Sequence, residues 1–280
     1  MSDGIDLSGK NAIVTGAGSG MGAVMAAALA DAGARVAGVD IDGDRIARLD
    51  AEWRGRHNER RFLGIKGDVS LLDDCRAAVA RTIAEFGGID ILVNNAGVGM
   101  APAQPAGATG RVRFWETVPE GWLRIIEINA TGAYLMAHAA APHMIARHWG
   151  RIVNVTTSYD TMMAPGLSAY GGGKAALEAG TAIWAKELEG TGVTANVLVP
   201  GGPTDTAFFP PGFPRDGLLK PTLMGPPIRW LASPQSDGVS GCRFIARDWD
   251  TSLPPGEAAA RLRAPAAWPE LAAAAASQRR

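Results

Sequence analysis

The sequence predicts an α/β fold in which a doubly wound parallel sheet of seven strands carries helices on both faces. Short apolar runs alternate with amphipathic stretches along most of the chain, which is the pattern of repeated βαβ units. The 280 residues are 47% apolar, enough for one large core, and no break in composition or internal repeat divides them. We expect strands at Ala12–Thr15, Arg35–Asp40, Phe62–Lys66, Ile91–Asn94, Ile152–Thr156, Thr194–Val199 and Arg243–Ala246.

Amphipathic stretches and two long loops fill the space between these strands. Segments 98–119 and 201–225 are rich in Gly and Pro, and each follows a strand. Loops of this length are usually functional, and open α/β sheets bind ligands at the carboxyl ends of their strands. We assign both loops to a domain at 1–250 and expect a C-terminal arm at 251–280, with a short helix around Pro269–Ser277. The expected helices are Gly20–Ala32, Asp42–Trp53, Leu71–Phe86, Glu120–Ala146, Gly171–Glu189 and Pro227–Ala232.

Charge and cysteine content argue against several classes of protein. The 27 basic and 28 acidic residues give a formal net charge of −1, which argues against nucleic acid or an anionic membrane as a partner. Cys75 and Cys242 form no metal-ligand spacing, so we expect no metal, and so few cysteines fit a reducing compartment.

We expect the cellular location of the protein from two segments that could direct it to or through a membrane. The first ten residues lack the basic and apolar regions of a signal peptide. Residues 128–146 carry no formal charge and are long enough to span a bilayer, but their polar side chains and Pro142 favour a buried helix. We therefore expect a cytoplasmic protein with no membrane partner.

A glycine-rich turn follows the first strand and opens the first helix. It reads Thr-Gly-Ala-Gly-Ser-Gly-Met-Gly over residues 15–22. Glycine permits positive φ in a tight turn and lets backbone N–H groups approach a pyrophosphate at the helix N-terminus. A glycine cluster alone is weak evidence, but the strand before it, the helix after it and four alternating glycines together predict a dinucleotide site.

Asp40 ends the second strand, eighteen residues after Gly22. An acidic side chain at this point accepts hydrogen bonds from both ribose hydroxyls of the adenosine half, and it repels the additional phosphate of NADP. No Arg or Lys stands at Ala17 or Ile41 to bind that phosphate, so we expect NAD as the cofactor. The alternative is that Asp40 only caps the following helix together with Asp42.

Two further segments lie at carboxyl ends of expected strands. Asp68 follows the third strand, where its carboxylate is placed to accept from an adenine amino group or to cap the next helix. Asn-Asn-Ala-Gly at 94–97 ends the fourth strand, and Gly97 would let a cofactor pass close to the backbone. Asparagine also serves turns in general, so this tetrapeptide is weak evidence by itself.

Tyr170 and Lys174 supply an acid/base pair for carbonyl chemistry. Hydride transfer to a carbonyl needs a proton donor beside the developing alkoxide, and the reverse reaction needs a base. The two residues are four apart at the start of an expected helix and so share one face. An ammonium group near a phenol favours the phenolate and lowers its pKa. Threonine and serine hydroxyls at 156–158 end the strand upstream.

Taken together, these motifs resemble the short-chain dehydrogenase/reductase family. They stand in family order and at family-like spacing from residue 10 to about 246, and as a set they are highly specific. The residues that carry the resemblance are Thr-Gly-x-x-x-Gly-x-Gly at 15–22, Asn-Asn-Ala-Gly at 94–97, Asn129 in a long helix, Thr157 thirteen residues before Tyr170, Tyr-x-x-x-Lys at 170–174 and Pro200-Gly201.

The resemblance implies a Rossmann-like sheet, a bound nicotinamide dinucleotide and a homotetramer or dimer. It also implies that Tyr170 is the acid/base, that Lys174 binds the nicotinamide ribose, that Thr157 orients the substrate oxygen and that Asn129 holds a water of a proton relay. The motifs and the resemblance together give the following cofactor-binding set: Gly16, Ser19, Gly20, Met21, Asp40, Asp68, Val69, Asn95, Ala96, Gly97, Tyr170, Lys174, Pro200, Gly201 and Thr206.

The chain departs from the family pattern in three places. Thr157 stands where the family has a serine, and neighbouring Ser158 is an alternative donor, although successive strand residues point to opposite faces. Glycines at 171–173 follow the tyrosine and would loosen the helix start unless a backbone approach to cofactor or substrate requires them. The turn after Pro200 is one residue longer than usual, which leaves Thr204 or Thr206 to meet the cofactor amide; we favour Thr206.

The sequence favours a dehydrogenase or reductase over two other classes. Apolar residues in the loops suit a hydrophobic or cyclic ketone or alcohol, unless they only attach the loops to the body. Lyase or epimerase chemistry on the same scaffold, and a non-catalytic NAD sensor, remain alternatives. The helices expected at 120–146 and 171–189 carry more apolar surface than one sheet face needs, so we expect a homo-oligomer.

Overall fold

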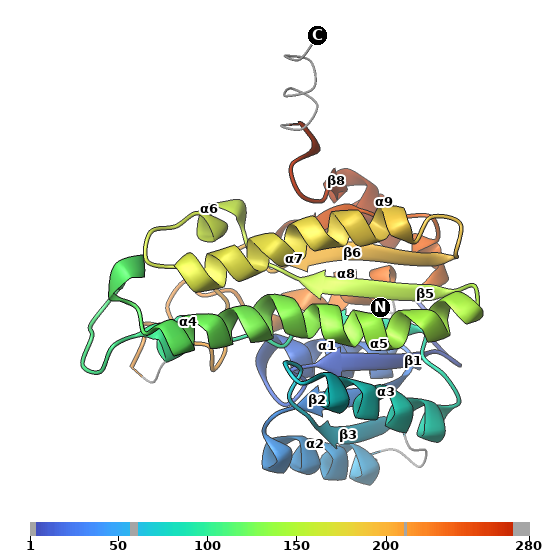
Figure 1. Ribbon diagram of the computed structural model, residues 1–280. Helices are drawn as coiled ribbons and strands as arrows, with labels where there is room; N and C mark the ends of the chain where they lie inside the picture. Colours follow the sequence, from blue (N-terminus) through green and yellow to red (C-terminus); the bar gives the residue numbers. More distant parts are fainter. Residues whose placement is uncertain (1–3, 57–60, 210–211, 271–280) are drawn as a thin grey trace.

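The computed structural model describes residues 4–56, 61–209 and 212–270, which fold around one twisted sheet (Figure 1). Within this part of the chain the strand order is β3-β2-β1-β4-β5-β6-β7-β8, and every neighbouring pair is parallel except β7 with β8. The strands are β1 (Asn11–Thr15), β2 (Arg35–Asp40), β3 (Phe62–Lys66), β4 (Ile91–Asn94), β5 (Gly150–Val155), β6 (Val193–Val199), β7 (Cys242–Ile245) and β8 (Ala264–Pro265).

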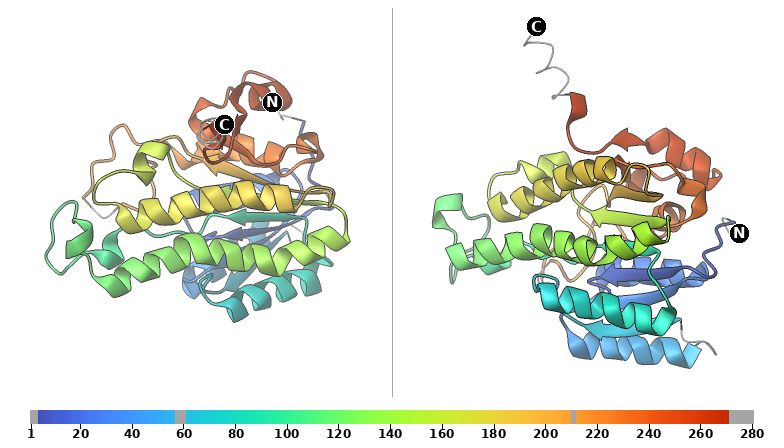
Figure 2. Two further views of the ribbon diagram at one scale, coloured as in Figure 1. Left: turned by 45° about the horizontal axis from the view of Figure 1, so that its top comes forward. Right: turned by 45° about the vertical axis from the view of Figure 1, so that its right-hand side comes forward.

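Helices cover both faces of the sheet. One core cluster joins α1, α2, α8 and α9 to one face, and a second joins α3, α5 and α7 to the other. Figure 2 shows α7 running alongside the α4–α5 pair in both views. The helices are α1 (Gly20–Asp31), α2 (Gly43–Arg56), α3 (Leu72–Phe86), α4 (Pro119–Ile126), α5 (Gly132–Ala146), α6 (Tyr159–Met162), α7 (Ser168–Glu187), α8 (Gly225–Leu231) and α9 (Pro255–Leu262).

The strand order creates a switch point between β1 and β4. From β1 the chain builds outward through β2 and β3, and then returns to place β4 on the other side of β1. The connections from the carboxyl ends of β1 and β4 therefore run in opposite directions, and doubly wound sheets bind their ligands in the crevice at such a switch point. The glycine-rich turn and the Asn94–Gly97 segment lie at these two ends.

The expected fold class is confirmed, with one additional strand. All seven expected strands form within two residues of their expected bounds, and the eighth is a two-residue antiparallel strand at the edge. The long helix expected at 120–146 is interrupted by a π-turn at Glu127–Thr131, which separates α4 from α5. Such single π-turns are frequent at functional sites.

The chain after residue 250 adds to the body of the molecule. Helix α9 was not expected from the sequence; it packs on α8 and β7, and Ala258 and Ala259 are buried in the first core cluster. Strand β8 then pairs with β7. The helix expected around Pro269–Ser277 lies largely outside the described residues, of which the last is residue 270.

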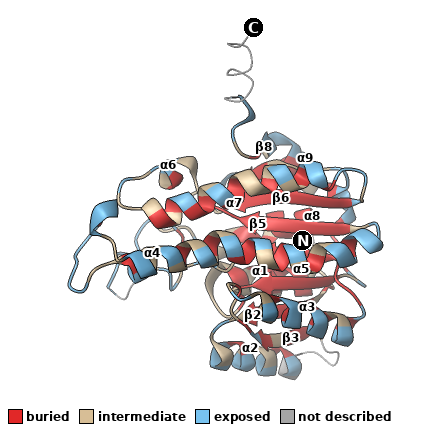
Figure 3. Cartoon of the chain, in the orientation of Figure 1, coloured by how far each residue is buried: buried red, intermediate tan, exposed pale blue. Residues whose placement is uncertain are grey.

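Burial follows the layers, as Figure 3 shows: the central strands β1, β4, β5 and β6 are buried along their length, whereas the outer helices alternate buried and exposed residues. The central strands need apolar side chains on both faces, because a parallel sheet with helices on both sides has no solvated face. None of the helices in the described ranges combines the length and the apolar character needed to cross a bilayer.

The glycine run at the start of α7 serves protein packing. A Cβ on Gly171 would lie 2.4 Å from the Met162 carbonyl oxygen, and one on Gly173 would lie 3.2 Å from Cβ of Asn129. Gly171 therefore leaves room for the backbone at the end of α6, and Gly173 allows α7 to pack closely against the π-turn. A Cβ on exposed Gly172 would meet nothing within 4 Å. Close packing against other parts of the protein therefore accounts for Gly171 and Gly173, and an approach of this backbone to cofactor or substrate stays a prediction.

The two adjacent glycines give a matched test of this packing. We expect Gly172→Ala to raise the free energy of unfolding by about 0.5–1 kcal/mol, because alanine favours a helix interior and nothing obstructs its methyl group. Gly171→Ala should lower it, because the Met162 backbone must move. Chemical denaturation of both variants measures the two effects, and equal changes in the same direction would contradict the packing explanation.

Candidate active site

The glycine-rich turn is wound tightly against the end of β4. Gly16 and Gly20 have φ of 65° and 55°, which only glycine adopts without strain. The Asn95 amide donates to the Thr15 carbonyl oxygen at 3.0 Å, and the backbone N–H groups of Asn95 and Ala96 donate to the Thr15 hydroxyl. The two carboxyl ends that border the crevice are therefore tied together by side-chain hydrogen bonds.

Asp40 lies at the rim of this turn, at the end of β2. One carboxylate oxygen accepts from the Gly18 N–H at 2.8 Å, and the other accepts from the Asp42 N–H at 3.0 Å. Each oxygen keeps a further lone pair for a ribose hydroxyl. Asp40 thus supports the turn that leads into α2, and its role toward the adenosine ribose stays a prediction.

Arg45, in the first turn of α2, was missed by the sequence analysis. Its guanidinium donates to the Ser19 hydroxyl at 3.3 Å, and its Cδ would lie 3.1 Å from a Cβ on Gly18. It also pairs with Asp42 at 3.3 Å. Neither position 17 nor position 41 carries a cation, but Arg45, one helical turn past residue 41, reaches the same rim.

Asp68 is neutralised by a residue from α4. Its carboxylate accepts from the Ser70 hydroxyl at 2.7 Å and pairs with Arg124 at 2.5 Å. Burial alone would raise the pKa of Asp68, but the hydrogen bonds from Ser70 and Arg124 outweigh it and hold the pKa below its ordinary value. Buried Val69 follows, packed against Gly132 at the start of α5. The carboxylate thus already has partners, and its role toward an adenine stays a prediction.

Thr157, Tyr170 and Lys174 meet where β5 leaves the sheet. The Thr157 hydroxyl lies close enough to Tyr170, in the first turn of α7, to lower the pKa of the phenol. Lys174 is one turn further along α7 and donates from Nζ to the Val155 carbonyl oxygen at 2.8 Å. A Cβ on Gly97 would lie 3.4 Å from the same Nζ, so the lysine also borders the end of β4.

Ser158 points to a different partner. Its hydroxyl lies 2.8 Å from the Thr161 hydroxyl, within the turn that opens α6. Strand β5 ends at Val155, so Ser158 lies outside it and the alternation of strand side chains no longer applies. Thr157 is therefore the hydroxyl that faces the tyrosine, in agreement with the spacing of thirteen residues.

Asn129 joins the π-turn to the end of β4. Its amide oxygen accepts from the Val98 N–H at 2.9 Å, and its amide nitrogen donates to the Val98 carbonyl oxygen at 2.8 Å. The same oxygen would lie 2.7 Å from a Cβ on Gly97. Its side chain thus holds the Gly97–Val98 backbone beside Lys174, and the water of a proton relay stays a prediction.

The loop after β6 reaches back to the glycine turn. Gly201 has a φ of 94°, and its neighbour Pro200 accepts from the Arg247 N–H. Thr204 is buried and bonds to Gly202 within the loop. By contrast, a Cβ on Gly20 would lie 3.0 Å from the Thr206 methyl group, so Thr206 lies against the turn. Thr206 therefore borders the glycine turn and Thr204 does not, and contact of Thr206 with the cofactor amide stays a prediction.

The pKa of Tyr170 lies above its ordinary value, opposite to the expected direction. Burial raises it, and the hydrogen bond with Thr157 offsets only part of that rise. Burial also lowers the pKa of Lys174 to about 8. Both shifts have the same origin, because burial disfavours the charged form of each group. The phenol is therefore protonated at neutral pH.

The buried lysine makes stability depend on pH in a defined window. The pKa of Lys174 falls from 10.5 to about 8 on folding, so between these values the unfolded chain binds more protons than the folded one. Stability therefore rises with pH through this window as far as Lys174 is concerned. Lys174→Met should remove that rise, whereas Lys186→Met, at an exposed position of the same helix, should keep it.

Chemical denaturation at several pH values across the window measures the two slopes. The comparison uses differences between variants, which cancels the titration of other groups. A slope for Lys174→Met equal to that of the unmutated protein would contradict the prediction.

Comparison with known proteins gives a single family. A family model described as short chain dehydrogenase matches residues 10–212. The chain is 31% identical over 244 residues to the 2,5-dichloro-2,5-cyclohexadiene-1,4-diol dehydrogenase LinX of Sphingobium indicum, covering 86% of this chain and 90% of that protein.

Solved structures agree in fold. One neighbour is a 3-ketoacyl-(acyl-carrier-protein) reductase from Brucella melitensis complexed with NADH, with TM-score 0.73, 31% identity and coverage of 85% of this chain and 96% of that one. Another is a gluconate 5-dehydrogenase from Burkholderia cenocepacia in complex with NADP and tartrate, with TM-score 0.75, 28% identity and coverage of 86% and 94%. The chain belongs to the short-chain dehydrogenase/reductase family of oxidoreductases, whose members act on alcohols and ketones with a nicotinamide cofactor.

Proposed function

We propose that the protein is an NAD(H)-dependent oxidoreductase of a secondary alcohol or ketone, with a hydrophobic or cyclic small molecule as substrate. The observation that carries this proposal is the meeting of the Thr157 hydroxyl, the Tyr170 phenol and the Lys174 ammonium at the carboxyl edge of the sheet, beside Gly97. This edge also holds the glycine-rich turn.

The residues present fit a nicotinamide dinucleotide. A Cβ on Gly22 would lie 2.0 Å from the Gly16 carbonyl oxygen, so the turn closes only with glycine and presents its backbone at the start of α1. Asp40 keeps lone pairs for the adenosine ribose, and Lys174 and Asn95 border the inner end of the crevice. When bound, the cofactor supplies or accepts the hydride.

The side chains of the protein itself carry out the proton transfer. Tyr170 is protonated at neutral pH because burial raises its pKa, so its hydroxyl is ready to donate to an alkoxide that develops on a substrate carbonyl. Thr157 donates to the same oxygen and fixes its position. Lys174 places a cation within the same enclosure, and this charge favours the phenolate that remains after the proton has moved.

The substrate side of the site is apolar and aromatic. Phe208, from the loop after β6, packs edge-on against the Tyr170 ring at a centroid distance of 5.4 Å, and a Cβ on Gly99 would lie 2.9 Å from its ring. Phe208 continues into a group with Phe209 and Phe213. These rings support a hydrophobic or cyclic substrate, because an aromatic wall beside the acid/base stabilises apolar surface more than a polyol or phosphate.

The alternatives gain no specific support. Lyase or epimerase chemistry would use the same Tyr170 and Lys174, and a sensor would not need their geometry. Homo-oligomer formation stays a prediction, supported by the exposed side chains of Leu123, Tyr134 and Ile183 on the helices α4, α5 and α7. The protein's cellular location likewise stays a prediction.

The cofactor proposal is tested by steady-state kinetics with both dinucleotides against a panel of alcohols and ketones. We expect kcat/KM to favour NAD(H) by at least about tenfold, a difference of about 1.4 kcal/mol. Asp40→Ala should erode this ratio by removing the carboxylate that repels the additional phosphate. Equal use of the two cofactors by the unmutated protein would contradict the assignment.

A second variant, at Arg45, tests the same cofactor preference. Its guanidinium stands at the ribose rim, so it should contribute to any gain in NADP(H) use that follows the loss of Asp40. The double variant Asp40→Ala/Arg45→Ala should therefore use NADP(H) less well than Asp40→Ala alone.

The roles of the two adjacent hydroxyls are tested by a matched pair of variants. Thr157→Ala should lower kcat/KM by about 10²-fold or more, the scale for the loss of one oxyanion donor, with NADH binding nearly unchanged. Thr157→Ser should keep most activity, because only a methyl group is lost. Ser158→Ala serves as the control and should have a much smaller effect, since its hydroxyl bonds to Thr161. The reverse order of severity would assign the role to Ser158.

A further inference from the structure

A buried ion pair lies directly behind the proposed catalytic hydroxyl. Arg243 of β7 and Glu178 of α7 are 2.6 Å apart, and their side chains are 5% and 0% exposed. Neither takes part in the proton chemistry described above. Removing two charges from water is costly, so a buried pair is weak evidence for a role in stability. The hydrogen bonds that the two side chains make point to another role.

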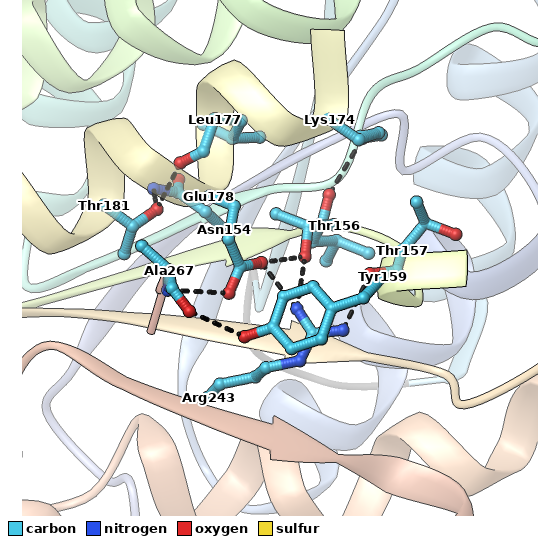
Figure 4. Close-up of polar contacts among 11 residues, drawn as sticks. Asn154, Thr156, Thr157, Tyr159, Lys174, Leu177, Glu178, Thr181, Arg243 and Ala267 are labelled. Atoms are coloured by element: carbon cyan, nitrogen blue, oxygen red, sulfur yellow. Dashed lines mark hydrogen bonds and ion pairs between the residues drawn. The ribbon is translucent and has the colours of Figure 1, made fainter. Parts of the chain in front are cut away.

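The pair and Lys174 together bond to three successive residues at the end of β5, as Figure 4 shows. Lys174 donates to the Val155 carbonyl oxygen, and the Thr156 hydroxyl donates to Glu178 at 2.7 Å. The second Arg243 nitrogen donates to the Thr157 carbonyl oxygen at 2.7 Å. Pairing of β5 with its neighbours ends at Val155, so Arg243 anchors the backbone of the catalytic residue at the point where the sheet no longer does so.

The C-terminal arm closes the outer side of this pair. The Arg243 guanidinium lies 4.2 Å from the centre of the Tyr159 ring, and the Tyr159 hydroxyl donates to the Ala267 carbonyl oxygen at 3.0 Å. The Ala267 N–H in turn donates to the other oxygen of Glu178 at 3.2 Å. Ala267 has a φ of 62°, a costly conformation for alanine that these two bonds maintain. Glu178 is thereby satisfied on both of its oxygens.

We propose that Arg243 and Glu178, enclosed by Tyr159 and Ala267, are positioning residues that hold the Thr157 hydroxyl in its reactive orientation. The inference rests on the proposed function in one respect, the role of Thr157 toward the substrate oxygen. Catalytic groups must be held within about 0.5 Å of their productive geometry by surrounding contacts. A turn residue beyond the last ladder pair does not reach that precision without an anchor, and Arg243 supplies the anchor.

Arg243→Met is the first test, with Arg151→Met as its matched control. Arg151 is also a buried arginine with an ion-pair partner, Asp237, but it stands near the amino end of β5, away from the site. Both variants should lower the melting temperature. Only Arg243→Met should lower kcat, by about tenfold or more, with KM and the Kd for NADH changed little. An equal loss of kcat in both variants would overturn the proposal, because it would show a general effect of lost stability.

A double-mutant cycle separates positioning from any other contribution. If Arg243 acts through Thr157, Arg243→Met should lose most of its effect on kcat in the Thr157→Ala background, where no hydroxyl remains to be positioned. Full additivity of the two losses would overturn the proposal.

A paired replacement keeps the test valid if the single variant does not fold. Glu178→Met/Arg243→Met replaces both charges by apolar side chains of similar length, which avoids leaving one charge buried without its partner. Its melting temperature should lie above that of Arg243→Met, while kcat stays low. Recovery of kcat together with stability would overturn the positioning role.

A crystal structure of Arg243→Met distinguishes this inference from the proposed function. We expect Thr157 to be displaced from Tyr170 while Ser158 keeps its bond to Thr161. An unmoved Thr157 would overturn the inference even for an active enzyme. Conversely, absence of NAD(H)-dependent turnover in the unmutated protein would count against the proposed function and leave this structural readout intact.

Discussion

The site depends on the point at which β5 leaves the sheet. The hydrogen bond from Lys174 to the Val155 carbonyl oxygen ties helix α7 to that strand end, at a residue that is the last in the ladder with β6. Tyr170 stands one helical turn before Lys174 on the same face, so the bond also sets the height of the phenol above the sheet. Thr157 is two residues beyond Val155 and meets the phenol there. A shift of α7 along β5 would move the base and the lysine together but separate both from the hydroxyl.

Most of the fold and most of the candidate site are predictable from the sequence because the relevant signals are local. A buried parallel strand is a short apolar run, and the glycine turn and the Tyr-x-x-x-Lys pair are each contained in one segment. The third group, Thr157, is identified by its spacing of thirteen residues from Tyr170, because α6 and its turns fill a fixed length between β5 and α7. The structure places Thr157 against Tyr170, and directs Ser158 elsewhere, as that spacing predicts.

The features that the sequence did not reveal arise from contacts between distant segments. Arg243 and Glu178 are 65 residues apart, and nothing near either one marks it as a partner of the other. Strand β8 is two residues long and contains a proline, which defeats any periodicity signal. The reason for glycine at 171 and 173 is visible only once the positions of Met162 and Asn129 are known. The sequence predicted a lowered pKa for Tyr170, whereas the pKa is raised. The nearby lysine can be recognised in the sequence, but the burial of the phenol cannot.

The ion pair between Glu178 and Arg243 also affects the charge environment of Lys174. Glu178 follows Lys174 by four residues, the spacing at which an acid and a base on one helix normally pair. Such a pair would raise the pKa of the lysine and direct its ammonium away from the site. Instead Glu178 is engaged by Arg243, Thr156 and the Ala267 N–H, and burial lowers the pKa of Lys174 to about 8. Lys174 thus retains hydrogen-bonding capacity toward the crevice beyond its single bond to Val155. The same arginine that anchors Thr157 on one side therefore leaves the lysine available on the other.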